Sequence, residues 1–257
     1  MSSFLFPFIL SLIAGLSTGI GSLIALFIKK FEQSYLAFAL GLSAGVMIYI
    51  SFIELLPESF EAIGNLLSLA LFFAGMGLIG IIDKFIPEVQ NPHHIPSPET
   101  NHNNKLLRTG VMTAIIMAVH NFPEGIAVFS SALIDARMGL LVAIAVAIHN
   151  IPEGIAVSMP IFYATKSKKK AFFYSFFSGL TEPLGALLAY FFLMPFLTPQ
   201  LMSGILAFVA GIMIYISLDQ LIPIAHKCKE QCKMNQQIVI IGAAIGMLIM
   251  ALTMMIV

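Results

Sequence analysis

Two almost identical hexapeptides place metal-binding groups in the middle of long apolar stretches. The sequence is HNFPEG from His120 to Gly125 and HNIPEG from His149 to Gly154. Residues four apart share one face of a helix, so each motif presents an imidazole and a carboxylate in the same direction. These pairs are His120 with Glu124 and His149 with Glu153. Imidazole nitrogen together with carboxylate oxygen is a ligand set for a divalent metal ion.

The residues that follow each histidine favour the same interpretation. Asn121 and Asn150 add an amide oxygen next to each histidine. Pro123 and Pro152 lack the backbone N–H that the carbonyl one helical turn earlier would have accepted. A carbonyl freed at membrane depth needs protein, water or an ion as its partner.

The composition is that of a membrane protein. Hydrophobic residues make up 59% and charged residues 10% of the 257 positions, against about 25% charged residues in soluble domains. Uncharged runs long enough to cross about 30 Å of hydrocarbon predict an all-α polytopic protein with eight transmembrane helices. The predicted spans are about 4–28, 34–57, 64–82, 109–134, 138–163, 171–194, 201–224 and 236–257. We treat residues 1–257 as a single transmembrane domain in which 85–107 form a loop.

The thirteen Lys and Arg residues predict the orientation. With eight spans the connections alternate sides, and Arg137 is the one basic residue that falls opposite the others. Connections rich in Lys and Arg tend to be cytoplasmic. We therefore expect a protein of the cell (inner) membrane with both its N- and C-termini extracytoplasmic and the 85–107 loop in the cytoplasm.

The chain contains an internal duplication. Residues 118–128, AVHNFPEGIAV, align with 147–157, AIHNIPEGIAV, and AGVMIYISFIELLP at 44–57 aligns with AGIMIYISLDQLIP at 210–223. The pairing of span two with seven and of span four with five predicts inverted repeats in a 3+2+3 arrangement. Inverted repeats around a site near the midplane are typical of secondary transporters.

Three carboxylates converge on one predicted depth, because Glu182 is central in its span, as Glu124 and Glu153 are in theirs. Each costs about 2.5–3.5 kcal/mol at the bilayer centre when it is ionised and unpaired. No Lys or Arg lies inside any predicted span. Either the carboxylates are protonated or a cation from outside neutralises them, and the neighbouring histidines and asparagines favour the cation.

Other polar residues lie nearer the ends of the spans, where two interpretations stay open for each group. Glu54, Glu58 and Glu61 lie on one side of the membrane, and Asp219 and His226 lie on the other. They form either an acidic entrance to the transport path on each side or simply the hydrated ends of helices. The loop contains His93, His94 and His102. It either binds metal loosely and passes it on, or is an inert linker. Solvated thiols, rather than soft-metal capture, are favoured for Cys228 and Cys232.

With two HNxPEG motifs on neighbouring central spans, the chain resembles the ZIP (Zrt-/Irt-like protein) family of metal-ion transporters. The similarity extends over the whole length and includes SGLTEP around Glu182. It implies a binuclear metal site. The residues that would hold the transported zinc are His120, Glu124, His149 and Glu153. The residues of an adjoining site for iron or a second ion would be Asn121, Asn150 and Glu182, sharing Glu124 and Glu153. Gln220 departs from the family pattern, which usually has glutamate there.

The expected function is uptake of divalent cations into the cytoplasm: zinc, together with iron, manganese, cobalt and cadmium. We expect no catalytic residues and no cofactor, because the metals are cargo. The partners are the cations and the lipid bilayer, with a homodimer suggested by analogy and no nucleic acid. Two alternatives remain open, a membrane-embedded zinc-dependent hydrolase and a metal exporter of the same fold.

Overall fold

The computed structural model describes residues 2–28, 33–85, 102–193, 196, 198–223, 225–226 and 237–256. The regular structure of these residues is helical throughout, which confirms the all-α prediction. The α-helices are α1 (Ser2–Phe27), α2 (Gln33–Ile50), α3 (Leu56–Ile63), α4 (Asn65–Phe85), α5 (His102–Ile134), α6 (Ala136–Thr165), α7 (Lys168–Gly179), α8 (Thr181–Leu188), α9 (Pro199–Tyr215) and α11 (Gln237–Ile256). Three π-helical turns join or extend them: η1 (Ser51–Leu55), η2 (Ala189–Leu193) and η4 (Ile216–Leu221).

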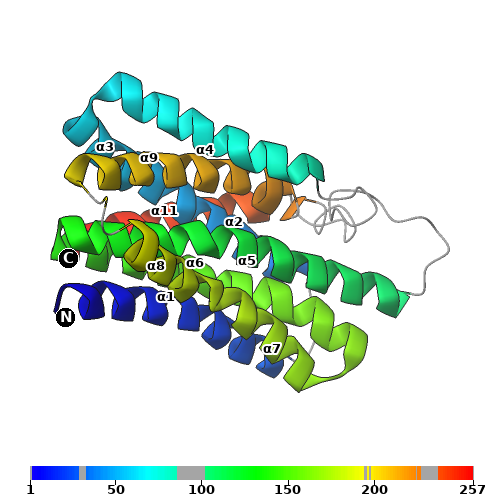
Figure 1. Cartoon of the computed structure of the whole chain (residues 1–257). Coiled ribbons are helices and arrows are strands. Elements are labelled where there is room, and N and C mark those ends of the chain that lie inside the picture. Colours follow the sequence, from blue (N-terminus) through cyan, green and yellow to red (C-terminus); the bar gives the residue numbers. More distant parts are fainter. Residues whose placement is uncertain are drawn as a thin grey trace.

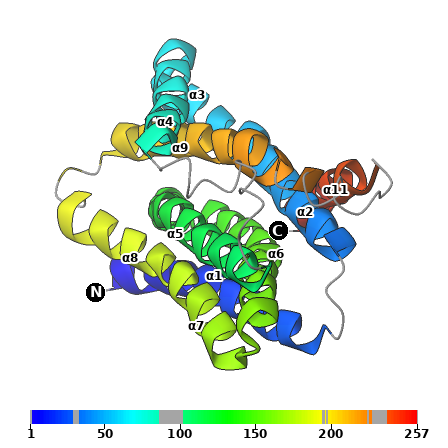
Figure 2. The same cartoon turned by 90° about the vertical axis from the view of Figure 1, so that its right-hand side faces the viewer.

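The helices form two layers (Figure 2). One layer contains α1, α5, α6, α7 and α8, and the other contains α2, α4, α9 and α11. Helices α5 and α6 pack against each other and also make the contacts between layers, since α6 packs on α2 and α5 packs on α9. The two helices that carry the HNxPEG motifs are therefore central in the molecule.

Among the described residues, six helices are long and apolar enough to cross a membrane. They cover Phe4–Phe27, Ser34–Ile63, Asn65–Ile82, Ala136–Thr165, Pro199–Leu221 and Gln237–Ile256. The predicted spans 109–134 and 171–194 are not among the six. The first is helical as part of α5, and the second is interrupted at Leu180 between α7 and α8. A multi-pass membrane protein is supported, and the count of eight spans stays a prediction.

The outer surfaces of α4 and α11 are apolar. Leu66 and Phe73 on α4, and Ile240 and Met255 on α11, are exposed. Exposed apolar faces of this extent are unusual in a soluble monomer and fit contact with lipid. The apolar surface of α4 and α11 is therefore consistent with the prediction that lipid surrounds most of the chain.

The two ends of the bundle differ in charge. The start of α1 and the end of α11 lie at the same end of the bundle (Figure 1), which is also the end where Asp135 joins α5 to α6. Arg137 is at this end, whereas Lys166 and the lysines of the first turn of α7 are at the other. Among the described residues, Arg137 is thus separated from Lys166 and the lysines of α7 as the sequence predicted, and which end faces the cytoplasm stays a prediction.

The loop predicted at 85–107 is shorter at its C-terminal side, because α5 already begins at His102. Leu, Lys and Arg are good helix formers, so the helix continues past the apolar span. His93 and His94, as well as Cys228 and Cys232, lie outside the described residues.

The segments 44–57 and 210–223 share a feature that the sequence did not reveal. Each contains a π-helical turn at the same place in the repeat, η1 in the first and η4 in the second. The alignment sets Ser51 against Ser217 and Glu54 against Gln220. π-Helical turns are rare and occur mostly at functional sites, so their matched positions support a common origin of the two segments.

Candidate metal site between α5 and α6

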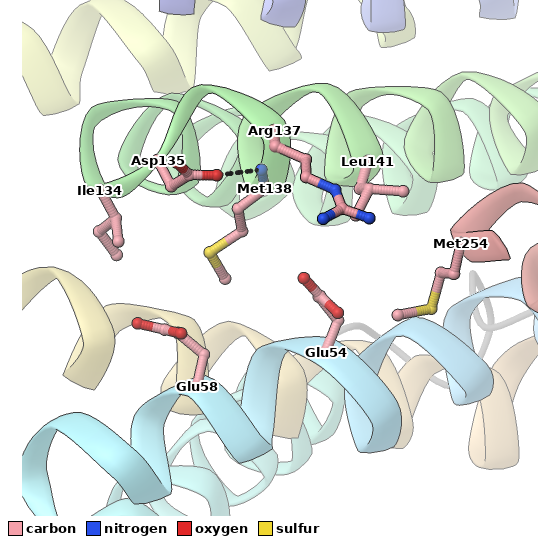
Figure 3. A pocket seen from close by; sticks show the side chains of 8 residues that line it. All are labelled: Glu54, Glu58, Ile134, Asp135, Arg137, Met138, Leu141 and Met254. Carbon is pink, nitrogen blue, oxygen red and sulfur yellow. Dashed lines mark hydrogen bonds between the residues drawn. The ribbon is translucent and has the colours of Figure 1, made fainter. Parts of the chain in front are cut away.

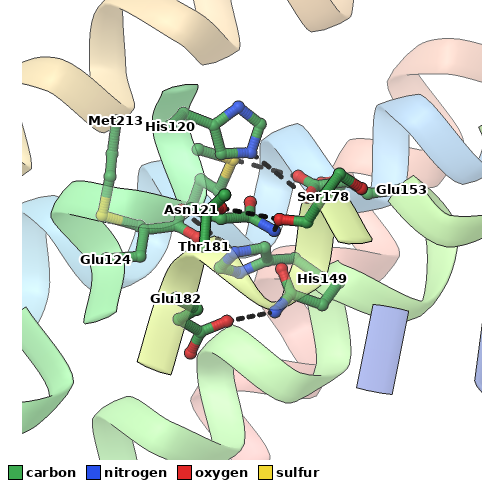
Figure 4. Close-up of polar contacts among 12 residues, drawn as sticks. His120, Asn121, Glu124, His149, Glu153, Ser178, Thr181, Glu182 and Met213 are labelled. Carbon is green, nitrogen blue, oxygen red and sulfur yellow. Dashed lines mark hydrogen bonds and ion pairs between the residues drawn. The ribbon is translucent and has the colours of Figure 1, made fainter. Parts of the chain in front are cut away.

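The two HNxPEG motifs meet in the contact between α5 and α6. Each of their histidines and glutamates is at most 1% exposed. The Nε2 atom of His120 lies 3.2 Å from Oε2 of Glu153, and Nε2 of His149 lies 3.2 Å from Oε1 of Glu124 (Figure 4). The residues share a helix face as the spacing predicts, but each histidine faces the glutamate of the other helix.

Much of the bonding capacity of these side chains is not used. The His120–Glu153 contact has hydrogen-bond geometry, whereas His149 and Glu124 are within ion-pair distance without forming a hydrogen bond. Both carboxylate oxygens of Glu124 and both ring nitrogens of His149 have no hydrogen-bond partner in the described structure. A buried polar atom left without a partner costs about 1–3 kcal/mol. Such a group of atoms is suited to receive a cation.

Ser43 on α2 is a member of the site that sequence reasoning missed. Its hydroxyl donates a 2.9 Å hydrogen bond to Oε1 of Glu153. Glu153 is thereby held by α2 as well as by α5. The available signal was weak: Ser43 directly precedes the duplicated segment 44–57, but serine is common in packed membrane helices.

The two motif asparagines make matching contacts with neighbouring helices. Asn121 donates through Nδ2 to the carbonyl of Ser178 on α7 at 3.3 Å. Asn150 donates through Nδ2 to the carbonyl of Ala14 on α1 at 3.0 Å, and also to Oε2 of Glu182 at 2.7 Å. The carbonyl oxygens of both side chains are buried and have no partner among the described atoms. The amide nitrogens therefore fix the asparagines and leave their oxygens available.

Glu182 joins this cluster from α8. Its side chain is fully buried, and its Oε1 atom has no hydrogen-bond partner in the described part of the chain. The structure thus brings together all seven residues predicted from the sequence (Figure 4). Glu182 is connected to the others by its hydrogen bond with Asn150.

The glycine that ends each motif permits close helix packing. A Cβ atom on Gly125 would overlap the backbone carbonyl of Glu182 on α8, and one on Gly154 would overlap that of Thr18 on α1. These contacts lie one turn from the histidines and set the distance between α5 and α8 and between α6 and α1. The motif glycines are therefore packing residues that position the histidines and glutamates of the two motifs.

The described His, Cys, Asp and Glu side chains include no group of three or more arranged to hold a metal ion. The histidines and glutamates instead form two pairs, each of which joins α5 to α6. Metal binding would require these side chains to exchange their mutual contacts for contacts with the ion.

An acidic cleft of about 370 Å³ opens at the end of the bundle where α5 joins α6 (Figure 3). Glu54 of η1 and Glu58 of α3 face Asp135 and Arg137 across it. Asp135 also caps α6 by accepting a 2.9 Å hydrogen bond from the backbone N–H of Met138. The cleft thus brings together Glu54 and Glu58, two of the three residues of the acidic entrance predicted on this side.

The other residues predicted for the two entrances do not line this cleft. Glu61 and Asp219 are exposed, and His226 is partly buried. Asp219 and His226 also do not line the smaller cavity beside His120, and the inner entrance stays a prediction.

Comparison with known proteins identifies similar sequences over nearly the whole chain. A family model described as ZIP zinc transporter matches residues 87–254. The zinc transporter ZupT of Streptococcus mutans is 50% identical over 99% of this chain and 99% of its own length. The zinc transporters ZupT of Oceanobacillus iheyensis and Clostridium perfringens are 49% and 46% identical, each over 99% of this chain and 99% and 97% of their own lengths.

Proposed function

The chain belongs to the ZIP family of zinc transporters, and we propose that it moves Zn²⁺ through the cluster of His120, Glu124, His149 and Glu153. Proteins of this family are transporters and not enzymes, so the hydrolase considered from the sequence is excluded. Zinc is the substrate of such a transporter, and no cofactor is needed.

The observation that carries the assignment is the pair of buried His–Glu contacts in spans without a basic residue. With both histidines neutral and both glutamates ionised, the four side chains carry two negative charges. One dication neutralises them, while a monovalent cation leaves a buried charge uncompensated. The cluster therefore favours divalent ions.

Loading the site with zinc would draw the four side chains together. Zinc lies about 2.0–2.1 Å from histidine nitrogen and about 2.0–2.2 Å from carboxylate oxygen, whereas the paired atoms are now 3.2 Å apart across the α5–α6 contact. The ion would replace each pairwise contact by two metal bonds. Because the ligands belong to two helices, binding couples directly to the α5–α6 geometry.

We propose an adjoining site for a second ion beside the first. The unpartnered atoms that support it are the side-chain oxygens of Asn121 and Asn150 and the Oε1 atom of Glu182. Shared carboxylates of Glu124 and Glu153 would complete a binuclear centre. Imidazole suits zinc and iron, and carboxylate and carbonyl oxygens suit manganese, so the mixed ligands of the two sites support a broad substrate range, which we propose to include iron, manganese, cobalt and cadmium.

We propose uptake as the direction of transport. An inside-negative membrane favours entry of a dication by about 4.6 kcal/mol per 100 mV, twice the value for a single charge. The eight-span topology with 3+2+3 inverted repeats, the inner-membrane location and the extracytoplasmic termini belong to this proposal. Matched π-helical turns and the separation of basic residues support it. Export by the same fold is the alternative.

The test is zinc flux in proteoliposomes, measured with zinc placed on each side in turn. Glu124→Ala and Glu153→Ala should abolish flux, because each removes a carboxylate ligand and leaves one negative charge for the dication. Glu61→Ala is the matched control, since Glu61 is exposed on α3 and away from the cluster. Flux at the wild-type rate in both cluster variants would refute the site assignment.

A further inference from the structure

A second, much smaller cavity lies against His120. It has a volume of about 20 Å³, and five isoleucines and one valine form most of its wall. The two polar residues among those that line it are His120 on α5 and Gln220 on η4. Gln220 is 4% exposed and His120 is 1% exposed, so neither side chain is hydrated by bulk solvent.

Both polar residues have an atom without a hydrogen-bond partner in the described structure, Oε1 of Gln220 and Nδ1 of His120. The other ring nitrogen of His120, Nε2, faces Glu153, and Nδ1 points away from it (Figure 4). A water molecule needs about 10–15 Å³ and at least two polar partners. The cavity satisfies both conditions, which wholly apolar cavities of the same size do not.

Gln220 also has an informative position in the duplicated sequence. It is equivalent to Glu54, and both residues are on π-helical turns. Glu54 lines the cleft of about 370 Å³, where a carboxylate can be hydrated. Gln220 instead lines the small, mostly apolar cavity. The oxygen of its neutral amide can accept a hydrogen bond there from a single water molecule.

We propose that Gln220 is a positioning residue for the zinc ligand His120, acting through a water molecule in this cavity. When zinc is bound, the Nδ1–H group of His120 donates to the water, and the water donates to Oε1 of Gln220. The proton then lies on Nδ1 and the lone pair of Nε2 faces the metal, in place of the hydrogen bond between Nε2 and Glu153. This inference rests on the proposed function, because it assigns a role toward the ion that His120 would bind.

The consequence is an effect on metal affinity rather than on the movement of the helices. Partners that hold the second nitrogen of a metal-binding histidine fix its tautomer and orientation, and their loss lowers metal affinity about 10–100-fold. Gln220 would thus tune zinc affinity without touching the ion.

The experiment compares Gln220→Met, Gln220→Glu and Ser217→Ala in the full-length protein. Methionine keeps the length of glutamine without its amide, and glutamate keeps an accepting oxygen. Ser217 is the control because it is buried on the same π-helical turn and donates a 2.8 Å hydrogen bond to the carbonyl of Met213 in its own segment. Zinc KM and maximal rate are measured in proteoliposomes, and zinc Kd by calorimetry on the purified protein.

We expect Gln220→Met to raise both the zinc KM and the zinc Kd by about tenfold, with a maximal rate close to that of the wild type. Gln220→Glu should restore most of the affinity, and Ser217→Ala should leave it unchanged. Wild-type KM and Kd in Gln220→Met, or no recovery in Gln220→Glu, would overturn the inference. Absence of flux in the wild type would refute the proposed function, and the calorimetric comparison would still decide the role of Gln220.

Discussion

Glu153 is held by side chains from two other helices. His120 on α5 contacts one of its oxygens and Ser43 on α2 donates to the other. The position of this carboxylate therefore depends on helices from both layers. A change of Ser43 tests whether that support matters for metal binding.

Ser43→Ala should raise the zinc KM in proteoliposome uptake by about tenfold, because an outer hydrogen bond to a metal-binding carboxylate is lost. Ser59→Ala is the control: its hydroxyl is equally buried and donates to Ser68 at 2.8 Å, between α3 and α4. Equal KM values for the two variants would show that the Ser43 hydrogen bond does not support the ligand.

The sequence predicted the residues of the site better than their partners. Spacing and the absence of basic residues were enough to select the two HNxPEG motifs and Glu182, because isolated charges in apolar spans are conspicuous. The crossed contacts of His120 with Glu153 and of His149 with Glu124 could not be predicted. An i, i+4 spacing specifies a helix face, and the partner of that face is decided by tertiary packing.

At the scale of elements, the positions of the ligands depend on how closely four helices approach. Gly125 lets α5 lie against the backbone of α8 at Glu182, and Gly154 lets α6 lie against α1 at Thr18. Small residues at such contacts are the usual means of close packing between membrane helices. The motif glycines were visible in the sequence, but the helices that they contact were not.

Gly125→Ala should destabilise the protein by about 1–3 kcal/mol, the usual cost of an added methyl group in a packed contact. It should also lower zinc uptake, because α8 and Glu182 must shift. Gly77→Ala is the matched control, since a Cβ atom there meets nothing within 4 Å. Thermal unfolding in detergent, together with flux, measures both effects; equal melting temperatures for the two variants would contradict the packing argument.

The π-helical turns η1 and η4 are the elements that no sequence pattern indicated. A single inserted residue does not change the apolar character of a span, so composition cannot reveal it. The duplication of the two segments was nevertheless visible from identity alone. Their matched turns place Glu54 on the acidic cleft of about 370 Å³ and Gln220 on the small, mostly apolar cavity of about 20 Å³.

At the scale of the whole molecule, two layers meet along α5 and α6, and an acidic cleft opens between them at one end. Each of the eight predicted spans is largely helical where the structure describes it, and the span 171–194 is divided at Leu180. The arrangement of the helices in two layers could not be predicted from the sequence. Helices that are apolar all round carry no stripe that identifies which face is buried, because lipid is as apolar as the interior.

The charges of the cleft should influence how fast cations arrive. The double variant Glu54→Gln/Glu58→Gln should lower uptake at limiting zinc a few-fold, and Arg137→Gln should increase it. Both effects should shrink as salt rises, because the Debye length falls from about 10 Å at 0.1 M to about 3 Å at 1 M.

Initial rates at low and high salt measure this effect of charge, with Glu61→Gln as the control outside the cleft. Identical rates for the Glu54/Glu58 variant and the wild type at low salt, or slower uptake in Arg137→Gln, would show that the cleft does not attract the substrate.

The most direct test of the central claim is anomalous diffraction at the zinc edge from crystals of the zinc-loaded protein. The account predicts a strong peak between α5 and α6, within about 2.0–2.2 Å of nitrogen and oxygen atoms of His120, Glu124, His149 and Glu153. The peak should be lost in Glu153→Ala. A wild-type protein that transports zinc but shows no zinc density between these helices would contradict it.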